Sequence, residues 1–511
     1  MSFFSIVVPR GEGHVERVPP DPVTLLQRHL DYPGFRPGQE ELVRAVLSGR
    51  DALGVLPTGG GKSVCYQVPA LALGGLTLVV TPLVSLMEDQ VGRAREAGLR
   101  AAHLSASQAT NDKRESLESA KEGRLDILFV APERPELDAF RTVLSALDVR
   151  LLAVDEAHCI SEWGHDFRPA YRRIGVLRSG LRCPTLALTA TATPSVRADV
   201  IACLALDRPL TVVRSFDRPN LAWSVLPGGS LRERASGAYR IMRHAPGCAI
   251  VYAPTRRVTE RVRDELASRG LRTEAYHAGL PGDERSRVQD AFMRGHCRCV
   301  VATNAFGMGI DKADVRTVVH IHLPGTLESY YQEAGRAGRD EKPAACVAFH
   351  DRPDRGLALR FVDRTHPPLR VLRRVHRELS RLAGPERVVR VDSEAHPQHA
   401  TLFSEWLDGT GAGVLAALER VDAVRHIQSA EEAGGTAAAA AGSQPARLGV
   451  RHRLDPALAG RLRGRALGKV DAVQRYALGR GCRRQALLGY FGEDAPERCG
   501  SCDRCVPPSH D

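Results

Sequence analysis

The segment LPTGGGKS, from Leu56 to Ser63, has the residue types and spacing of a phosphate-binding loop. It follows an apolar run and precedes a helical pattern, which is the context that such a loop requires. Lys62 would reach the β- and γ-phosphates, and Ser63 would ligate Mg²⁺. Leu56 stands where the common pattern has its first glycine. We predict that ATP is bound by Thr58, Gly59, Gly60, Gly61, Lys62 and Ser63.

Two acidic residues would complete this chemistry farther along the chain. The apolar segment LLAV ends at Asp155 and Glu156, the first residues of DEAH. Asp155 would hold Mg²⁺ through water, and Glu156 would position or activate the water that attacks the γ-phosphate. An acidic pair at the end of a strand could arise by chance. Because this pair follows a phosphate loop, we interpret it as the catalytic partner of that loop.

The segment YYQEAGRAGRD supplies two arginines, Arg336 and Arg339. An arginine that reaches the γ-phosphate stabilises the charge of the transition state and raises the rate about 10³- to 10⁵-fold in related hydrolases. We predict that Arg339 has this role and that Arg336 makes a supporting phosphate contact. The alternative is two surface arginines on a helix. The small residues between them favour a tightly closed interface instead.

Four of the twelve cysteines gather near the end of the chain. Their pattern, CxxCxxC preceded by one distant cysteine, suits a tetrahedral zinc site whose distant ligand comes from the start of a helix. An iron–sulfur cluster is the main rival, and disulfides are disfavoured in a reducing compartment. The other eight cysteines are interpreted as small buried hydrophobes. The predicted ligands are Cys482, Cys499, Cys502 and Cys505.

Alternating apolar strands and helices must position these groups. Such alternation predicts mostly parallel sheets covered by helices, with ligands at the carboxyl ends of the strands. It occurs twice, so we predict an α/β protein with two tandem lobes followed by a mainly helical insert and a zinc-binding module. The predicted parts are an N-terminal extension at 1–23, lobe 1 at 24–213, lobe 2 at 214–352, the insert at 353–465 with a flexible loop at 430–446, and the zinc-binding module at 466–511.

The charge of the chain favours a polyanionic partner. The formal net charge is +11, and ten basic residues face two acidic ones between Arg451 and Tyr490. A basic protein can simply be more soluble, and a basic run can be a solvated helix face. The cysteine cluster beside this run favours nucleic-acid contact.

One uncharged stretch, from Ser63 to Met87, is long enough to cross a bilayer. Prolines and glycines divide it into a helix, a turn and a β-branched strand, so we predict a buried α/β unit. The first residues lack a positive region and Pro9 interrupts their apolar run, which argues against a signal peptide. We expect no membrane association and a cytoplasmic, nucleoid-associated protein.

An ordered set of motifs resembles a known family. The chain contains, in order, FRPGQEELV, LPTGGGKS, TPLVSLMEDQV, VDEAHCISEWGHDFRP, LTATAT, ATNAFGMGIDKADVR and QEAGRAGRD. These resemble the RecQ family of DNA helicases, in helicase superfamily two, and SEWGHDFRP separates them from RNA helicases that share DEAH. The resemblance implies two RecA-like lobes and ATP-dependent 3′–5′ unwinding of DNA in repair or recombination. The implied cofactors are ATP, Mg²⁺ and Zn²⁺, and the implied partner is single-stranded and forked duplex DNA.

The same resemblance implies roles for further residues. Gln39 would bind the adenine edge, with Arg36 nearby and Tyr32 stacking on the ring. Other motif residues would couple the nucleotide to DNA and to lobe movement or would precede the arginines. These are Thr189, Thr191, Gly309, Asp311 and Gln332.

In this family the loop after DEAH senses single-stranded DNA. Trp163 or Phe167 could stack on unpaired bases for about 1 to 3 kcal/mol each, and Arg168 could meet a phosphate. Because the loop is joined to the acidic pair, DNA binding could shift Glu156. The alternative is that both aromatic rings pack inside the lobe. The residues predicted for this coupling are Ser161, Trp163, His165, Phe167 and Arg168.

The insert departs from the family pattern, in which the zinc module comes soon after the second lobe and precedes a winged-helix domain. We interpret residues 365–455 as a displaced winged-helix-like insert, with GVLAALERVDAVRHIQ as its recognition-like helix and following strand. A structural spacer is the alternative. For the whole chain the rivals are a DNA-stimulated translocase or annealing factor with weak unwinding, a scaffold whose ATPase has decayed, and an RNA helicase.

Overall fold

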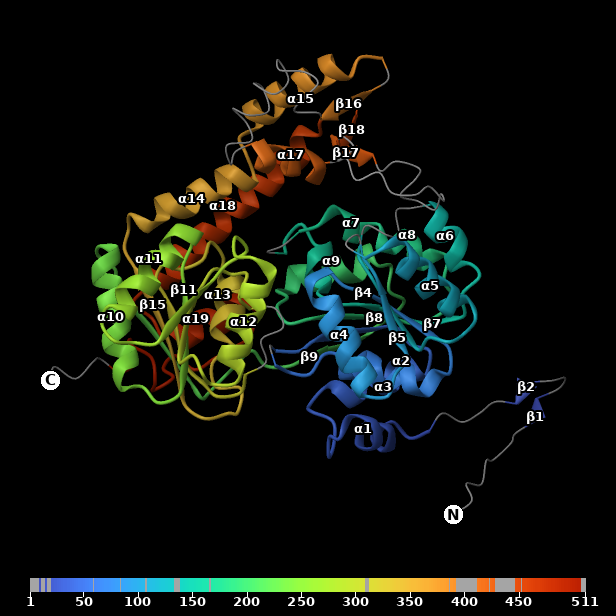
Figure 1. Ribbon diagram of the computed structural model, residues 1–511, viewed down its shortest axis with the longest axis horizontal. Coiled ribbons are helices and arrows are strands. Elements are labelled where there is room, and N and C mark those ends of the chain that lie inside the picture. The colour runs from blue at the N-terminus through green and yellow to red at the C-terminus, as the bar shows by residue number, and fades with distance from the viewer. Residues whose placement is uncertain are drawn as a thin grey trace. The chain divides into compact units, whose positions relative to one another are not determined.

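The computed structural model divides into two compact units (Figure 1). Unit 1 is Met1–Asp166 with Ala170–Ser215, and unit 2 is Phe167–Pro169 with Phe216–Asp511. The structure describes residues 9–10, 14–15, 20–57, 59–82, 84–105, 108–132, 138–164, 167–307, 312–385, 387–391, 411–421, 423–427, 446–451 and 453–506. The predicted site residues Thr58, His165, Gly309 and Asp311, and nearly all of the loop predicted at 430–446, lie outside these ranges.

Unit 1 is built on a parallel sheet of seven strands in the order β5-β6-β4-β7-β8-β3-β9. Its central strands are buried on both faces, as the β-branched and apolar runs of the sequence require. The strands are β3 Ala52–Val55, β4 Leu76–Val80, β5 Ala101–Leu104, β6 Ile127–Val130, β7 Val149–Val154, β8 Thr185–Thr189 and β9 Leu210–Val213.

Helices cover this sheet and form a core with it. The apolar side chains of α2, α3 and α4 join those of the strands in one buried cluster. The helices of unit 1 are α1 Pro22–Leu30, α2 Gln39–Leu47, α3 Val64–Leu73, α4 Val84–Glu96, α5 Thr110–Lys121, α6 Asp138–Leu144, α8 Ile174–Ser179 and α9 Pro194–Cys203, together with the 3₁₀ helix η2 Ala157–Ile160; α7 Pro169–Arg172 begins in the short segment grouped with unit 2.

Unit 2 begins with a second parallel sheet, whose six strands have the order β10-β15-β14-β11-β13-β12. Its strands are β10 Leu221–Pro227, β11 Cys248–Tyr252, β12 Thr273–Tyr276, β13 Cys299–Ala302, β14 Val315–His320 and β15 Ala344–His350. Its helices are α10 Leu231–His244, α11 Arg256–Ala267, α12 Gly282–Met293 and α13 Leu327–Ala334. The predicted fold class, with two parallel-sheet lobes of RecA-like type, is confirmed.

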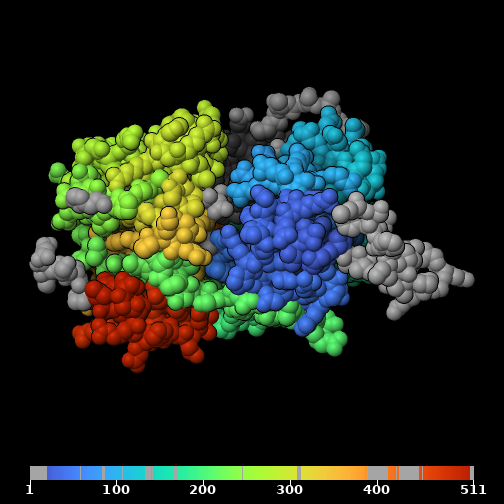
Figure 2. All heavy atoms as spheres, turned by 90° about the horizontal axis from the view of Figure 1, so that it is seen from below, coloured from blue at the N-terminus to red at the C-terminus, as the bar shows by residue number. Residues whose placement is uncertain are grey.

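The rest of unit 2 is mainly helical, as predicted, and also includes short strands. It contains a three-stranded antiparallel sheet with the order β16-β18-β17. Its elements are α14 Asp354–Thr365, α15 Leu369–Ala383, β16 Val388–Val391, α17 Gly411–Arg420, β17 Val424–Ile427, β18 Ala446–Val450, α18 Pro456–Leu478 and α19 Arg483–Tyr490. Helix α19 packs on β10, so the C-terminal residues, red in Figure 2, lie beside the green start of unit 2.

The uncharged stretch from Ser63 to Met87 forms α3, strand β4 and the beginning of α4. Gly74 has a positive φ of 64° and ends α3, as a glycine at a helix C-terminus commonly does. Within the described ranges, no helix has both the length and the apolar character needed to cross a membrane.

Candidate active site and metal centre

The loop between β3 and α3 has the backbone of a phosphate cradle. Gly59 and Gly61 have positive φ values of 81° and 68°, which side-chain-bearing residues rarely adopt. A Cβ on Gly60 would lie 2.8 Å from the Pro57 carbonyl oxygen. Ser63 stands at the N-cap of α3, so the loop delivers its glycines to a helix N-terminus. That end of a helix favours anions.

Gln39 and Arg36 hold this loop from the side. The Gln39 side chain is 3 % exposed, and its Nε2 donates to the Gly60 and Gly61 carbonyl oxygens, each at 2.9 Å. Its Oε1 accepts from the Arg36 backbone N–H at 2.9 Å, and the Arg36 guanidinium donates to the Gly59 carbonyl oxygen. The structure therefore brings both predicted residues to the phosphate loop. Tyr32, predicted to stack on the adenine ring, is about half exposed.

The lysine of the loop and the glutamate of DEAH meet at the carboxyl edge of the sheet. The Lys62 Nζ atom lies 3.7 Å from Glu156 Oε1. Glu156 follows β7 and has a left-handed backbone, φ 47° and ψ 44°, which is uncommon for a residue with a side chain. Strain of this kind concentrates at functional sites. This conformation carries the chain away from the strand and into η2.

Asp155 is half-buried, as is Glu156, the other member of the acidic pair. Its Oδ1 accepts from the Glu156 backbone N–H at 2.9 Å, and Gln90 Nε2 lies 3.5 Å from its Oδ2. Burial, assisted by the charge of Glu156, raises the pKa of Asp155 to about 6, whereas Lys62 opposes the rise. A divalent cation at this carboxylate would favour its ionised form. The carboxylate pair and Ser63 have the oxygen chemistry that suits Mg²⁺.

A side-chain path leads from Glu156 to the predicted threonines. His158 Nδ1 lies 3.3 Å from Glu156 Oε2 and 2.9 Å from Thr189 Oγ1. The Thr191 backbone N–H in turn donates to Thr189 Oγ1 at 3.2 Å. His158 and both threonines are buried. The structure thus joins the DEAH segment to the LTATAT segment through one histidine.

The loop after DEAH folds back on this histidine. The Ser161 hydroxyl donates to Asp199 Oδ2 at 2.7 Å and accepts from the Trp163 backbone N–H at 3.1 Å. A Cβ on Gly164 would lie only 2.2 Å from the His158 carbonyl oxygen, so no other residue fits there without a shift of the backbone. The Trp163 side chain itself is 46 % exposed. The loop is therefore anchored by its backbone while its indole remains accessible.

The next residues of this loop behave differently. Phe167 is half-buried and packs against the apolar cluster of the insert, within unit 2. Arg168 is half-buried as well. Stacking of Phe167 on bases stays a prediction, and Trp163 is the more accessible of the two rings.

In unit 2 the predicted arginines follow α13. The Arg336 guanidinium donates to the Gly307 carbonyl oxygen, and a Cβ on Gly307 would collide with that guanidinium. Arg336 is therefore joined to the segment ATNAFG, which leads to the predicted Gly309 and Asp311. Gln332 and Arg339 are half-buried. Their predicted roles at the phosphates stay predictions.

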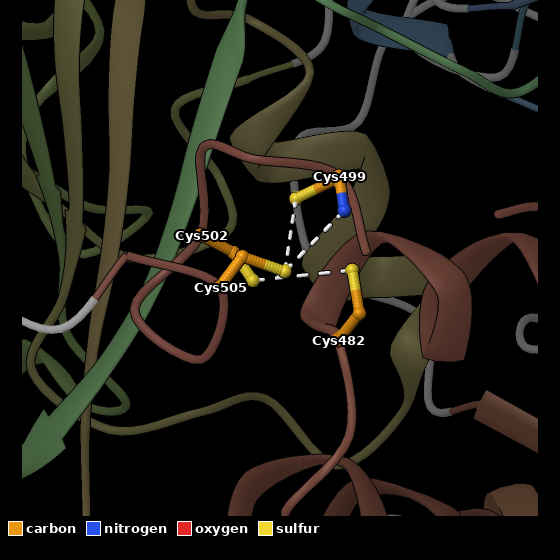
Figure 3. A group of neighbouring side chains, drawn as sticks. All are labelled: Cys482, Cys499, Cys502 and Cys505. Atoms are coloured by element: carbon orange, nitrogen blue, oxygen red, sulfur yellow. Dashed lines mark hydrogen bonds between the residues drawn. The ribbon is translucent and has the colours of Figure 1, made fainter. Parts of the chain in front are cut away.

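The four predicted cysteine ligands lie together (Figure 3). Their Sγ atoms are all within 4.8 Å of one another, and the pairs Cys499–Cys505 and Cys482–Cys502 are each separated by 3.9 Å. A tetrahedral zinc ion with bonds of about 2.3 Å to sulfur separates its ligands by about 3.8 Å. The cluster therefore fits zinc in both ligand type and size.

Backbone donors support the sulfur atoms. The Cys499 backbone N–H donates to Cys505 Sγ at 3.3 Å, and the Arg483 N–H donates to Cys502 Sγ at 3.4 Å. Such donors stabilise thiolate ligands. The Arg483 side chain is fully buried and pairs with Asp503 at 3.0 Å. The Asp503 backbone N–H donates to Trp223 of β10 at 3.1 Å, which attaches the metal site to the second sheet.

Three family models match the chain. They are DEAD/DEAH box helicase at residues 36–200, helicase conserved C-terminal domain at 234–341, and RecQ zinc-binding at 453–506. The chain is also 44 % identical over 335 residues to "ATP-dependent DNA helicase RecQ" of Pasteurella multocida, a match covering 65 % of this chain and 52 % of that one. The chain thus resembles RecQ helicases over 65 % of its length and matches the RecQ zinc-binding model near its C-terminal end.

Other RecQ relatives give the same result. The RecQ helicase of Bacillus subtilis is 43 % identical over 334 residues, covering 65 % of this chain and 56 % of that protein. The "Probable ATP-dependent DNA helicase RecS" of the same organism is 40 % identical, covering 63 % of this chain and 65 % of that protein. The chain thus spans about half to two-thirds of the length of these three bacterial relatives.

Solved structures agree on the fold of the lobes. "DUF1998 helicase MrfA bound to DNA and AMPPNP" has a TM-score of 0.55 and 18 % identity, covering 70 % of this chain and 53 % of that chain. "DEAD-box helicase Mss116 bound to ssRNA and UDP-BeF" has the same TM-score and identity, covering 70 % and 81 % of the two chains. At these identities the likeness shows the fold of the lobes.

The structure adds three residues to those selected from the RecQ motifs. His158 connects Glu156 to Thr189, Gln90 approaches Asp155, and Gly164 closes the loop after DEAH. A signal for each was present, since His158 and Gly164 stand inside the quoted DEAH segment and Gln90 ends MEDQ. The sequence does not show which side chains of distant segments contact one another.

Proposed function

We propose that this protein is an ATP-dependent DNA helicase of RecQ type that moves 3′ to 5′ along one strand. The observation that carries the proposal is the meeting of Lys62 and Glu156 at 3.7 Å beside Asp155, at the end of a glycine cradle. A phosphate-binding cation and a water-activating carboxylate at this distance can act on the same γ-phosphate. The likeness to RecQ helicases supports DNA as the substrate.

Each group in the site would have a distinct task. The Gly59–Gly61 amides and Lys62 would bind the phosphates, and Ser63 and Asp155 would hold Mg²⁺, which supplies charge neutralisation when bound. Glu156 would orient the attacking water and accept its proton. Arg339, with Arg336 beside it, would stabilise the charge that develops on the transferred phosphoryl group. Hydrolysis and release would then reset the two lobes for the next step along the strand.

DNA sensing would reach the site through the backbone of the loop after DEAH. Trp163 is exposed enough to stack on an unpaired base, while Gly164 is held against His158, which contacts Glu156. A base that moves the indole would therefore move the segment that carries His158. We propose that this contact couples DNA binding to the position of Glu156. We also propose zinc at the cysteine cluster and a cytoplasmic, nucleoid-associated location.

The test is ATP hydrolysis with and without single-stranded DNA. For the wild type we expect stimulation of at least tenfold, and for Lys62→Ala no turnover. Trp163→Ala should bind DNA but lose most of the stimulation, whereas Trp163→Phe, which keeps a ring, should retain it. Stimulation that is unchanged in Trp163→Ala would contradict the proposed coupling.

Strand separation needs its own measurement, because a translocase or annealing factor would also pass the ATPase test. We expect the wild type to unwind a forked duplex with a 3′ single-stranded tail and to leave a 5′-tailed duplex intact. ATP hydrolysis stimulated by DNA without unwinding of either substrate would favour the translocase. Stimulation by RNA alone would favour an RNA helicase.

A further inference from the structure

The insert between the second lobe and the zinc module is a small domain with its own core. Helices α15 and α17 and the antiparallel sheet β16-β18-β17 share one apolar cluster, drawn in orange to red-orange in Figure 1. Among the described elements of the insert, the order helix, strand, helix, strand, strand, with the last strand in the middle of the sheet, resembles a winged-helix fold. In such folds the helix before the last two strands, here α17, commonly contacts DNA.

In this insert α17 is committed to packing. A Cβ on Gly413 would lie 2.3 Å from the Arg364 carbonyl oxygen, so α17 lies directly against the end of α14. Its single basic residue, Arg420, donates to the Thr365 carbonyl oxygen at 2.5 Å. Helix α17 therefore offers little charge and little free surface to a phosphate backbone. The recognition-like role suggested by its sequence does not suit this packing.

Helix α15 has the opposite character. Leu372, Val375, Leu379 and Ala383 point into the core of the insert. The other side of the helix carries five exposed arginines at a spacing of three or four residues, which places them on one face. We call this face the arginine stripe; it consists of Arg370, Arg373, Arg374, Arg377 and Arg381.

Four of these arginines have no partner within the described part of the chain. Arg381 pairs with Glu378 at 3.1 Å, but Arg370, Arg373, Arg374 and Arg377 make no ion pair or hydrogen bond there. The neighbouring helix α18 is different. Its Arg463 pairs with Asp363 at 2.7 Å and its Lys469 with Glu328 at 3.3 Å. The charge of α18 therefore holds the fold together, whereas that of α15 is left for a ligand.

We propose that the arginine stripe of α15 binds the sugar-phosphate backbone of duplex DNA, independently of base sequence. The inference rests on the proposed helicase function, because it assigns a duplex-binding surface to that activity. From Arg370 to Arg381 the stripe is about 16 Å long, which matches about five base pairs of duplex. Guanidinium groups bind phosphates bidentately and remain charged at every relevant pH.

The composition of the stripe favours duplex DNA over single-stranded DNA and over a protein partner. Helix α15 contains no Phe, Tyr or Trp, so it has no platform on which unpaired bases could stack. Its one histidine, His376, is directed to the Arg451 carbonyl oxygen at 2.9 Å. The exposed face also lacks the apolar anchors that a protein partner would bury at the centre of an interface.

The experiment compares two quadruple variants of the full-length, zinc-loaded chain. The stripe variant is Arg370→Ala, Arg373→Ala, Arg374→Ala and Arg377→Ala. The control removes four exposed arginines of unit 2 that also make no ion pair in the described structure, with Arg240→Ala and Arg243→Ala on α10 and Arg257→Ala and Arg261→Ala on α11. Fluorescence anisotropy would give the Kd for a 20-base-pair duplex between 50 and 200 mM salt, alongside ATP hydrolysis with a dT oligonucleotide.

We expect the stripe variant to lower the slope of log Kd against log salt by about 3 to 4 and to weaken duplex binding at least tenfold. A stripe of lysines at the same four positions should restore the slope. The control should change the slope by less than about 1. ATP hydrolysis stimulated by dT should persist in both variants.

Two results would overturn the inference. One is a duplex affinity and salt slope equal to those of the wild type while the far-ultraviolet spectrum shows a folded protein. The other is an equal loss of affinity for the duplex and the dT oligonucleotide, which would assign the stripe to single strands. Failure of the proposed function is distinguishable, because the wild type itself would then show no stimulation by dT.

Discussion

At the scale of single residues, backbone shape determines how the predicted catalytic carboxylate is presented. Glu156 leaves β7 in a left-handed conformation, and Gly164 returns the chain to the His158 carbonyl oxygen. Between them lies a short 3₁₀ turn whose four residues are buried. The acid, the histidine and the exposed Trp163 are therefore parts of one rigid turn. We therefore expect a substitution at Gly164 to shift Glu156, and a shift of Glu156 to alter the loop at Gly164.

Replacement of Gly164 by Ala tests this rigidity. The new Cβ would meet the His158 carbonyl oxygen at 2.2 Å, so we expect a loss of about 1 to 3 kcal/mol in the free energy of unfolding of unit 1, together with weaker stimulation of ATP hydrolysis by DNA. Urea denaturation would measure it. Gly92→Ala is the matched control, because Gly92 lies on the exposed face of α4 with open space around it. That change should be neutral or stabilising.

A second residue-scale prediction concerns Gln39. Its amide already donates to two loop carbonyl groups and accepts from Arg36. To read adenine it must also present its remaining hydrogen-bonding capacity to the base. We expect Gln39→Ala to weaken ATP binding about tenfold and to reduce the preference for ATP over GTP, as measured by titration with both nucleotides. An equal loss for ATP and GTP would mean that Gln39 acts only by supporting the phosphate loop.

At the scale of elements, the basic run from Arg451 to Tyr490 is used largely inside the protein. Arg463, Lys469, Arg483 and Arg484 each pair with an acidic residue of unit 2. The acidic partners lie on α14, on α13, in the cysteine loop and before β10. Helices α18 and α19 are thereby attached to the second sheet. Free positive charge is found instead on α15.

Removal of metal tests the role of the cysteine loop. The four cysteines lie at the start of a short helix and in a loop with few apolar residues, so a bound zinc ion would supply most of the stability of this segment. We expect a chelator or Cys499→Ser to release one zinc ion per chain and to expose residues 482–506 to protease. Metal analysis and limited proteolysis would measure both effects. Cys183→Ser is the control, because Cys183 lies outside the cluster. Iron in the purified protein would contradict the zinc assignment.

At the scale of the whole molecule, the chemistry is divided between two units. The phosphate loop and the acidic pair belong to unit 1, whereas the predicted arginines belong to unit 2. With the role proposed for Arg339, hydrolysis would depend on the movement of the units, and each cycle could do mechanical work.

We expect Arg339→Ala to lower kcat for ATP hydrolysis about 10³-fold or more and to change the Kd for ATP only a few-fold, because the arginine would act on charge that develops in the transition state. Single-turnover kinetics and nucleotide titration would separate the two quantities. Arg240→Ala, a change of an exposed arginine on α10, is the control. A normal kcat in Arg339→Ala would assign the completing charge to another residue.

The sequence by itself determined the parts whose chemistry is local. A glycine cradle, an acidic pair after an apolar strand, and cysteines spaced by two residues each act over a few residues, so Lys62, Glu156 and Cys499 could be named from their neighbours. The two parallel sheets followed from alternating apolar runs. Such features depend on backbone geometry that short segments specify by themselves.

Only the tertiary structure decided which charges and faces remain free. Arg463 on α18 and Arg373 on α15 look alike in the sequence, yet one is paired with Asp363 and the other is exposed with no partner among the residues that the structure describes. In the same way, the close contact of Gly413 with α14 is invisible in the apolar pattern of α17. The physical reason is that pairing and burial depend on residues that are distant in the chain and become neighbours only when the elements pack together.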